Sequence, residues 1–224
     1  MTKLQKKTIP LTSTVERDEF ISASEVAFDC LFDGTSKFFP WELPVLPKTF
    51  KIGVIVGSSG SGKSTLLKEF GSEENPTWDP NKSILSHFEN PEDAITKLSS
   101  VGLNSVPSWY KPYHVLSNGE KFRADLARKI KTHAVIDEFT SVVDRNVAKA
   151  ASVSLARYVK NSDIHNVVLS TCHRDILDWL EPDWVIDTDS GELIDGFFLS
   201  DQKSNLTYIA QTMIVGECLA SITI

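Results

Sequence analysis

A glycine-rich loop set between an apolar stretch and a helical pattern constrains this chain more than any other feature. Residues 50–56 are largely apolar, as expected for a buried strand. The loop follows directly and consists of Gly57, Ser58, Ser59, Gly60, Ser61, Gly62, Lys63, Ser64 and Thr65. After it, Leu66, Leu67 and Phe70 share one helical face, and Gly71 is a natural helix end. This order of strand, G-x-x-x-x-G-K-[ST] loop and helix predicts a phosphate-binding loop.

The chemistry of a triphosphate explains these residue types. Backbone N–H groups that curl around a helix N-terminus complement closely spaced anionic oxygens. Glycines let the backbone approach the phosphates, and Lys63 adds a mobile positive charge for the β and γ groups. Ser64 is placed to face Mg²⁺. A flexible Ser/Gly linker is the plain alternative, but a linker is not framed by a strand and an amphipathic helix.

Composition narrows the class of protein further. The 224 residues are 41% hydrophobic and carry a net charge of −7, which supports a real core and disfavours broad attraction to nucleic acid. The chain has no run of 18 apolar residues, and residues 1–8 lack the apolar segment of a signal peptide. We therefore expect a cytoplasmic protein. Cys30, Cys172 and Cys218 are isolated from one another, so neither a disulfide framework nor a paired metal motif is predicted.

Beyond the loop, strand patterns alternate with helix patterns, which predicts an α/β fold with a mostly parallel sheet. The expected strands are Ile84 to Phe88, Ala134 to Ile136 and Asn166 to Thr171. The expected helices start near Asn90, near Ser117 and at Asp144. Ala94, Ile95, Leu98 and Val101 form the apolar face of the first of these helices. Residues 1–49 suggest an irregular or small β-rich region.

Polar residues lie where the later strands end. Asp137 can hold the Mg²⁺ shell, and Glu138 beside it can polarise a water for attack on the γ-phosphorus. His173 follows another strand, where a histidine taken by itself is more often an ordinary surface or core residue. Because ligands bind at the carboxyl ends of the strands in a parallel sheet, we expect these side chains to share one site with Lys63.

The order of these segments resembles that of ATP-binding cassette (ABC) ATPases over roughly residues 50–195. Leu116 to Arg128 resembles the LSGGQ signature and its helix, and Ala134 to Glu138 resembles the Walker B strand. Ser141 to Asp144 resembles the D-loop, Ser170 to His173 the switch-histidine strand end, and Asp183 to Leu193 the closing hairpin. Three residues depart from the family pattern without touching a catalytic role, namely Asn118 for glycine, Glu120 for glutamine and Phe139 for proline.

The resemblance implies a P-loop NTPase fold of ABC type, with a mostly parallel core sheet, helices on both faces, a small N-terminal β-rich region and a reduced helical subdomain. Residues 1–49 would belong to the nucleotide-binding β subdomain, and residues 50–196 would form the ATPase core. Residues 83–130 would form the helical subdomain within that core, and residues 197–224 a C-terminal extension.

The same resemblance implies a head-to-tail homodimer around two ATP–Mg²⁺. Lys63, Glu138 and His173 would be catalytic, and Ser64 and Asp137 would hold the metal. Ser117, Asn118, Gly119 and Asp144 would contact the nucleotide bound by the second subunit. Asn118 is expected to tolerate a left-handed backbone there. An aromatic residue before the loop would stack on adenine; Phe38, Phe39 and Trp41 are available, and Phe38 and Trp41 are the ones we select.

One family residue is missing. Transporter cassettes carry a glutamine between the phosphate loop and the signature, whereas the glutamines here are Gln5, Gln202 and Gln211. His87 stands nearest that place and is the candidate replacement at the metal. The helical interval is also short for a cassette that docks on a membrane protein.

These departures favour a soluble cassette with a non-membrane partner. Residues 104–109 and the signature are similar to ABC-type ATPases associated with GNAT-type acetyltransferase-like domains. A separate GNAT-like or DNA-modifying partner is therefore expected, and nucleic acid would be met only through it. The alternatives are a transporter subunit, an ATP-dependent dimerisation switch with little turnover and, less well matched, a small-molecule kinase.

Overall fold

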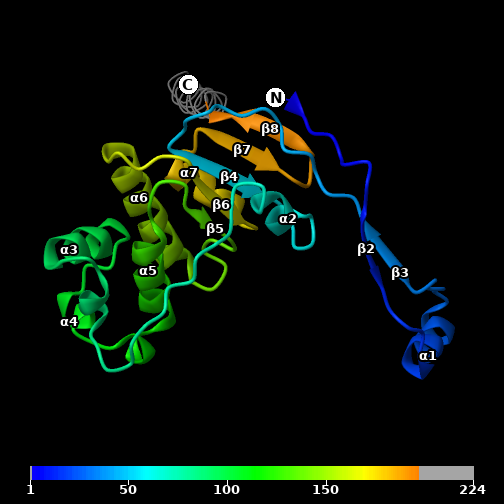
Figure 1. Cartoon of the computed structure of the whole chain (residues 1–224), viewed down its shortest axis with the longest axis horizontal. Coiled ribbons are helices and arrows are strands. Elements are labelled where there is room, and N and C mark those ends of the chain that lie inside the picture. Colours follow the sequence, from blue (N-terminus) through cyan, green and yellow to red (C-terminus); the bar gives the residue numbers. More distant parts are fainter. Residues whose placement is uncertain (1, 197–224) are drawn as a thin grey trace, which may run out of the picture.

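A six-stranded sheet forms the centre of the molecule (Figure 1), in a computed structural model that describes residues 2–196. Its strands, in spatial order, are β1 (Thr2–Lys3), β8 (Glu192–Asp195), β7 (Trp184–Asp187), β4 (Ile52–Val56), β6 (Val167–Thr171) and β5 (Val135–Ile136). Strand β4 runs parallel to β6 and β7, and β5 runs parallel to β6. Strand β8 is antiparallel to β7 and β1. The sheet is therefore mostly parallel, as the sequence predicts.

Strand β4 lies in the interior of the sheet, between β7 and β6, and both of its faces are covered. All five of its residues are buried, which explains why its sequence is a continuous apolar run. Val54 and Val56 pack into one core, whereas Ile55 packs into a second core on the opposite face. The strand thereby carries its carboxyl end, and the glycine-rich loop that follows, to one edge of the sheet.

Helices cover both faces of this sheet. On one face lie α3 (Pro91–Ser100), α5 (Asn118–Lys129), α6 (Arg145–Asn161) and α7 (Leu177–Leu180), which contribute Leu98, Leu126, Leu155 and Leu180 to the larger core. On the other face, α2 (Lys63–Leu67) packs Leu66 and Leu67 against Trp184. The short α4 (Val106–Trp109) and the 3₁₀ turns η1 (Ile84–His87), η2 (Tyr113–Val115) and η3 (Arg174–Ile176) complete this part of the chain.

The helix starts agree with their sequence signals. The Asn90 side chain accepts a hydrogen bond from the Asp93 N–H at 2.9 Å, and Pro91 opens α3. Ser117 and Glu120 form a reciprocal capping box at the start of α5. On α3, Ala94 and Leu98 are buried as expected, but Ile95 is 49% exposed. The buried stripe of this helix is therefore narrower than predicted.

The expected strand at Ile84 to Phe88 is wrong, because this segment forms the 3₁₀ turn η1. The Ile84 N–H donates to the Lys111 carbonyl at 2.9 Å, and Ile84 is fully buried. The segment is therefore anchored by one buried side chain to the loop before α5, away from the sheet. A short apolar run is compatible with either structure, and periodicity alone does not distinguish them.

The N-terminal region forms an arm, residues 11–38, that projects from the body (Figure 1). Strands β2 (Leu11–Thr14) and β3 (Thr35–Phe38) pair as a separate antiparallel hairpin. Helix α1 (Glu19–Phe28) lies between them, at the far end of the arm. The sequence predicted some β structure here but did not anticipate this helix.

Among the described residues, no helix is both long and apolar enough to cross a bilayer. The predicted C-terminal extension, residues 197–224, lies outside the described residues, and so do Gln202, Gln211 and Cys218. The proposed division of the chain into domains remains a prediction.

Candidate functional site

The glycine-rich loop joins β4 to α2 and is shaped by two different uses of glycine. Gly62 precedes α2 with φ 96°, and a Cβ there would lie 2.5 Å from the Phe38 ring. Gly60 has φ 79°, and a Cβ there would meet nothing within 4 Å. The space above Gly60 is therefore open to a ligand, as the sequence predicts, whereas Gly62 also makes room for Phe38.

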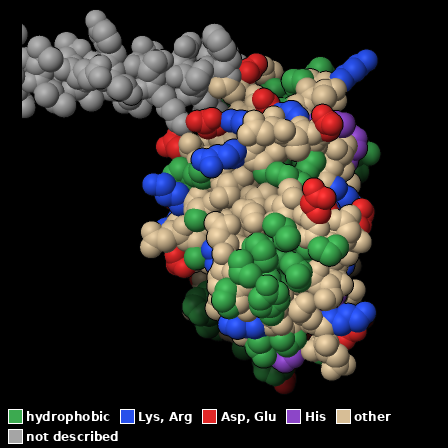
Figure 2. Space-filling model, turned by 90° about the vertical axis from the view of Figure 1, so that its left-hand side faces the viewer, with side chains coloured by type: hydrophobic (Ala, Val, Ile, Leu, Met, Phe, Trp, Pro, Cys, Tyr) green, Lys and Arg blue, Asp and Glu red, His purple; other side chains and the backbone are tan. Residues whose placement is uncertain are grey.

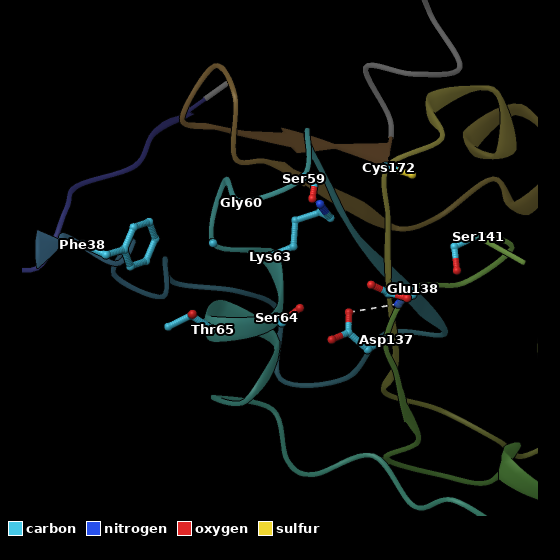
Figure 3. A pocket seen from close by; sticks show the side chains of 11 residues that line it. Phe38, Ser59, Gly60, Lys63, Ser64, Thr65, Asp137, Glu138, Ser141 and Cys172 are labelled. Carbon is cyan, nitrogen blue, oxygen red and sulfur yellow. Dashed lines mark hydrogen bonds between the residues drawn. The ribbon is translucent and has the colours of Figure 1, made fainter. Parts of the chain in front are cut away.

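A cavity of about 340 Å³ opens beside this loop (Figure 3). Its walls come from the loop, from the end of β5, from the arm and from the residue after β6. They consist of Phe38, Ser59, Gly60, Gly62, Lys63, Ser64, Thr65, Asp137, Glu138, Ser141 and Cys172. In Figure 3, Phe38 and the two acids lie on opposite sides of Lys63. One cavity thus combines the loop, the acid pair and one candidate aromatic residue.

Lys63 is available to a ligand. Its ammonium group donates to the carbonyl of Ser58 at 2.7 Å, which closes the loop on itself. A neutral carbonyl is a weaker partner for an ammonium group than an anionic phosphate oxygen. Lys63 can therefore exchange this internal contact for a phosphate in the same cavity.

Asp137 is held in its ionised form. Burial alone would raise its pKa, but hydrogen bonds from Ser170, Ser64 and the Glu138 N–H, together with the charge of Lys63, lower the pKa below its ordinary value. The bond from the Glu138 N–H is 2.9 Å long. An ionised carboxylate beside a serine hydroxyl is a donor set that suits Mg²⁺. Ser64 and Asp137 therefore fit the metal role that the sequence predicts.

Glu138 occupies a constrained backbone. Its φ is 49°, and Thr140 has a φ of 68°, a region that residues other than glycine seldom adopt. Strand β6 holds this turn in place, because the Phe139 N–H donates to the Ser170 carbonyl at 2.7 Å and the Thr171 hydroxyl donates to the Phe139 carbonyl at 2.9 Å. Such over-determined backbone is common at functional sites. It presents the exposed Glu138 side chain at the cavity wall.

His173 lies next to the cavity wall without lining it. Its neighbour Cys172 forms part of the wall. The Nδ1 atom of His173 is 3.4 Å from the Thr140 hydroxyl, so the histidine contacts the same turn that carries Glu138. The structure therefore brings His173 close to the acid pair, as the sequence predicts, but leaves its reach to a phosphate as a proposal.

A cluster of charged residues that the sequence analysis missed contacts the glycine-rich loop. Asp189, in the turn between β7 and β8, accepts hydrogen bonds from the Ser58 N–H at 2.9 Å and from the Ser58 hydroxyl at 2.7 Å. Arg174, which follows His173, donates to Asp189 at 2.8 Å and also pairs with Asp187. The sequence placed Asp187 and Asp189 in the segment that resembles the closing hairpin, but no local signal showed that they contact Arg174 and Ser58.

The signature residues lie outside this cavity. Ser117 and Asn118 are exposed at the N-terminus of α5, and Gly119 follows them. Asn118 is the first residue of the helix and is not among the residues with positive φ. The left-handed backbone that Asn could tolerate is therefore not used here, because the capping box begins the helix at this position. Asp144 also has a structural task, since its side chain caps α6 by accepting from the N–H groups of Asn146 and Val147.

Of the three available aromatic residues, Phe38 lines the cavity, and Phe39 and Trp41 do not. Trp41 packs over the turn between β7 and β8, where a Cβ on Gly191 would lie 2.7 Å from its ring. The ammonium group of Lys6 lies 4.9 Å from the centre of the Trp41 ring. The structure thus gives Trp41 a packing role and leaves Phe38 as the candidate surface for a base.

His87 does not reach the site either. Its Nε2 accepts from the Asp79 N–H at 2.9 Å, and its Nδ1 lies 2.8 Å from the Ser83 carbonyl. Both ring nitrogens are therefore engaged within the loop before α3, and the ring packs at 4.9 Å against Trp78. This geometry contradicts the predicted metal role of His87, and we do not retain it.

Comparisons with known proteins agree with this geometry. No protein-family model matches the chain. An energy-coupling factor transporter ATP-binding protein, EcfA1, from Caldanaerobacter subterraneus subsp. tengcongensis is 26% identical, over 78% of this chain and 79% of that protein. The solved structure of the ATP-binding cassette MJ0796 in a dimeric post-hydrolysis state with ADP and Pi matches with a TM-score of 0.51 and 15% identity, over 87% of this chain and 98% of that chain. The chain therefore has the fold of ABC ATPases, and its sequence is similar to that of a transporter ATP-binding protein.

A further solved structure supports this fold. The structure of cbiO1 from Clostridium perfringens, described as part of the transporter complex cbiONQ, has a TM-score of 0.50 and 18% identity, over 76% of this chain and 87% of that chain. ABC ATPases bind ATP with Mg²⁺, and the donor set around Ser64 and Asp137 fits that pair. EcfA1 and cbiO1 are both described as parts of transporters, and neither is described with an acetyltransferase. The comparisons therefore do not support the expected GNAT-like partner.

Proposed function

We propose that this ABC ATPase is the ATP-hydrolysing subunit of a transporter, and that two copies close head to tail around two ATP–Mg²⁺. The observation that carries the enzymatic part is the shared cavity of Lys63, Asp137 and Glu138. The transport part is supported by the similarity to EcfA1, the ATP-binding protein of an energy-coupling factor transporter. The chain would then lie against a separate membrane protein on the cytoplasmic side.

Each residue of the cavity has a distinct task in this proposal. Lys63 and the loop N–H groups bind the phosphates, and Phe38 provides a surface for the base. Ser64 and Asp137 would hold Mg²⁺, which would supply positive charge against the phosphates. Glu138 orients a water in line with the bond to the leaving ADP and takes a proton from it as the water oxygen bonds to phosphorus. His173, which follows β6, would reach the γ-phosphate.

The second copy is proposed because one chain does not complete the site. The helix N-terminus at Ser117 and Asn118 is exposed and lies outside the cavity. Such a terminus favours an anion, and the resemblance assigns it to the γ-phosphate of the other subunit. A head-to-tail pair would place Ser117, Asn118 and Gly119 of each copy over the cavity of the other, with the Asp144 segment near the contact.

The Glu138→Gln variant tests the enzymatic part. It keeps the size of the side chain but removes the proton acceptor, so turnover should fall by at least about 100-fold while ATP binding persists. Light scattering with saturating ATP–Mg²⁺ should show a stable dimer. The variant Glu92→Gln, on the exposed start of α3, is the matched control and should hydrolyse ATP normally. A Glu138→Gln chain that stays monomeric would contradict the ATP-dependent pair.

Co-purification from native cells tests the choice of partner. Recovery of an integral membrane protein, together with transport that fails without this chain, supports the proposal. Recovery of a soluble acetyltransferase-like protein in its place would overturn the transporter assignment. It would favour the soluble cassette with a non-membrane partner, which the short helical interval suggests.

A further inference from the structure

The arm, residues 11–38, has almost no core of its own. Glu25 is the buried residue of α1, and it is held by Arg17 and by the Phe32 N–H at 2.7 Å. Most large apolar side chains of the arm lie on its surface, namely Leu11, Val15, Phe20, Val26, Phe28 and Leu31. Val26, Phe28 and Leu31 are 86%, 80% and 91% exposed. A single two-stranded hairpin is at best marginally stable in water.

An apolar surface of this kind marks an interaction site. Six acidic residues and one arginine fall within residues 16–33, namely Glu16, Asp18, Glu19, Glu25, Asp29, Asp33 and Arg17. The occupant of this surface should therefore be apolar at its centre and basic or neutral at its edge.

The same molecule carries such a surface at its other end. The lobe surface consists of Ile95 on α3, Val106 on α4, and Tyr110 and Val115 just beyond it, and all four are exposed. Figure 2 views the molecule from this side and shows hydrophobic side chains gathered there. Residues 104–115 include Lys111 and no acidic residue. Glu92 and Asp93 lie in the first turn of α3, close in sequence to Ile95, so the two surfaces match in polarity throughout and in charge over residues 104–115.

One copy cannot bring its own two surfaces together, because the arm lies on the opposite side of the body from α3 and α4 (Figure 1). A two-fold axis would bring each surface onto its complement in the other copy, and both contacts would form at once. The arm also ends at Phe38, which lines the nucleotide cavity. The arm is therefore continuous with the face that the second copy is proposed to cover.

We propose that the arm of each copy docks on the lobe surface of a second copy. This inference rests on the head-to-tail pair proposed above and adds to it a second contact outside the nucleotide. In the pair, the arm would hold the helical lobe of the partner copy beside the cavity that the partner's signature helix is proposed to close.

A cross-link tests this contact directly. Cys30 is free and exposed at the tip of the arm. The full chain with Tyr110→Cys and Cys30→Ser is mixed with the wild-type chain, oxidised mildly and mapped by peptide mass spectrometry. A disulfide from Cys30 of the wild-type chain to position 110 of the variant supports the inference. The control places the cysteine at Val45, which is 97% exposed and outside both surfaces. Equal cross-linking to position 45, or none to position 110, would overturn it.

A charge substitution separates this inference from the proposed function. In the Glu138→Gln background with ATP–Mg²⁺, Val26→Asp and Phe28→Asp should each weaken dimerisation at least about tenfold, whereas Val45→Asp should not. If the background chain dimerises and the arm variants match it, the arm contact alone is wrong. If the background chain never dimerises although the wild type hydrolyses ATP, the head-to-tail pair itself is wrong. Arm variants that dimerise normally but lose a co-purifying membrane protein would assign the arm to that protein and overturn the inference.

Discussion

Asp189 holds Ser58 by two groups at once, accepting from its backbone N–H at 2.9 Å and from its hydroxyl at 2.7 Å, although the two residues are 131 positions apart. The hydrogen bonds from Ser58, together with those from Arg174, lower the pKa of Asp189 below its ordinary value. The first half of the phosphate loop is therefore fixed by the turn between β7 and β8. Arg174 ties the same turn to the segment of His173.

Asp189→Ala should weaken ATP binding about tenfold, which corresponds to about 1.4 kcal/mol, because the loop loses charge-assisted hydrogen bonds that fix its shape. A fluorescence titration with a labelled ATP analogue measures the dissociation constant. Asp163→Ala removes an exposed acid after α6 and serves as the control. An unchanged dissociation constant for Asp189→Ala would show that the loop keeps its shape without this carboxylate.

Phe38→Ala and Trp41→Ala should have different effects. Loss of Phe38 removes a wall of the cavity and should raise the ATP dissociation constant about tenfold, since stacking of a base on an aromatic ring contributes about 1–3 kcal/mol. Loss of Trp41 should lower the melting temperature and leave ATP affinity nearly unchanged, because its ring packs on Gly191. Paired thermal melts and titrations check both outcomes. A larger loss of affinity in Trp41→Ala would restore it as the base surface.

His87→Ala should destabilise the protein by about 1–3 kcal/mol, because the Asp79 N–H loses its acceptor and Trp78 loses a packing partner. The Mg²⁺ concentration that gives half-maximal ATPase activity should not change. Denaturant unfolding and a Mg²⁺ titration of hydrolysis provide the two measurements. A raised Mg²⁺ requirement in a well-folded variant would return His87 to the metal site.

Glu120 should make stability depend on pH. Hydrogen bonds from Ser108, from the Ser117 N–H and from the Ser117 hydroxyl lower its pKa to about 2, from 4.5. Because the folded-state pKa is the lower one, its contribution is fully present above about pH 4.5 and is lost as pH falls toward 2. The melting temperature of wild type should therefore exceed that of Glu120→Gln by a constant amount from pH 5 to 8. This difference should shrink between about pH 4.5 and 2.

A difference that persists undiminished at the lowest pH where both chains still fold would contradict the assignment. It would mean that the hydrogen-bonding shape of residue 120, and not its charge, stabilises the start of α5. Glu92→Gln, on the exposed face of α3, is the matched control for removal of one carboxylate.

Local signals predicted part of this structure well. The run around β4 is apolar because the strand is buried on both sides, and the starts of α3 and α5 depend on residues three positions apart. These interactions lie within a few residues of each other, so the sequence displays them directly. The same local reading failed at Ile84, where a contact with Lys111 decides the backbone. It also failed at Ile95, because the sequence of a helix does not show how much of its apolar face the neighbouring elements cover.

The glycine-rich loop, the acid pair after β5 and the order of the motifs could be read from the sequence, because each is a short segment whose chemistry needs adjacent residues. The contact of Asp189 with Ser58, the position of Phe38 rather than Trp41 at the cavity and the engagement of His87 elsewhere became visible only in the folded chain. Those relationships join residues that the chain keeps far apart or that compete for the same neighbour. They are fixed only when the strands pair and the helices pack around them.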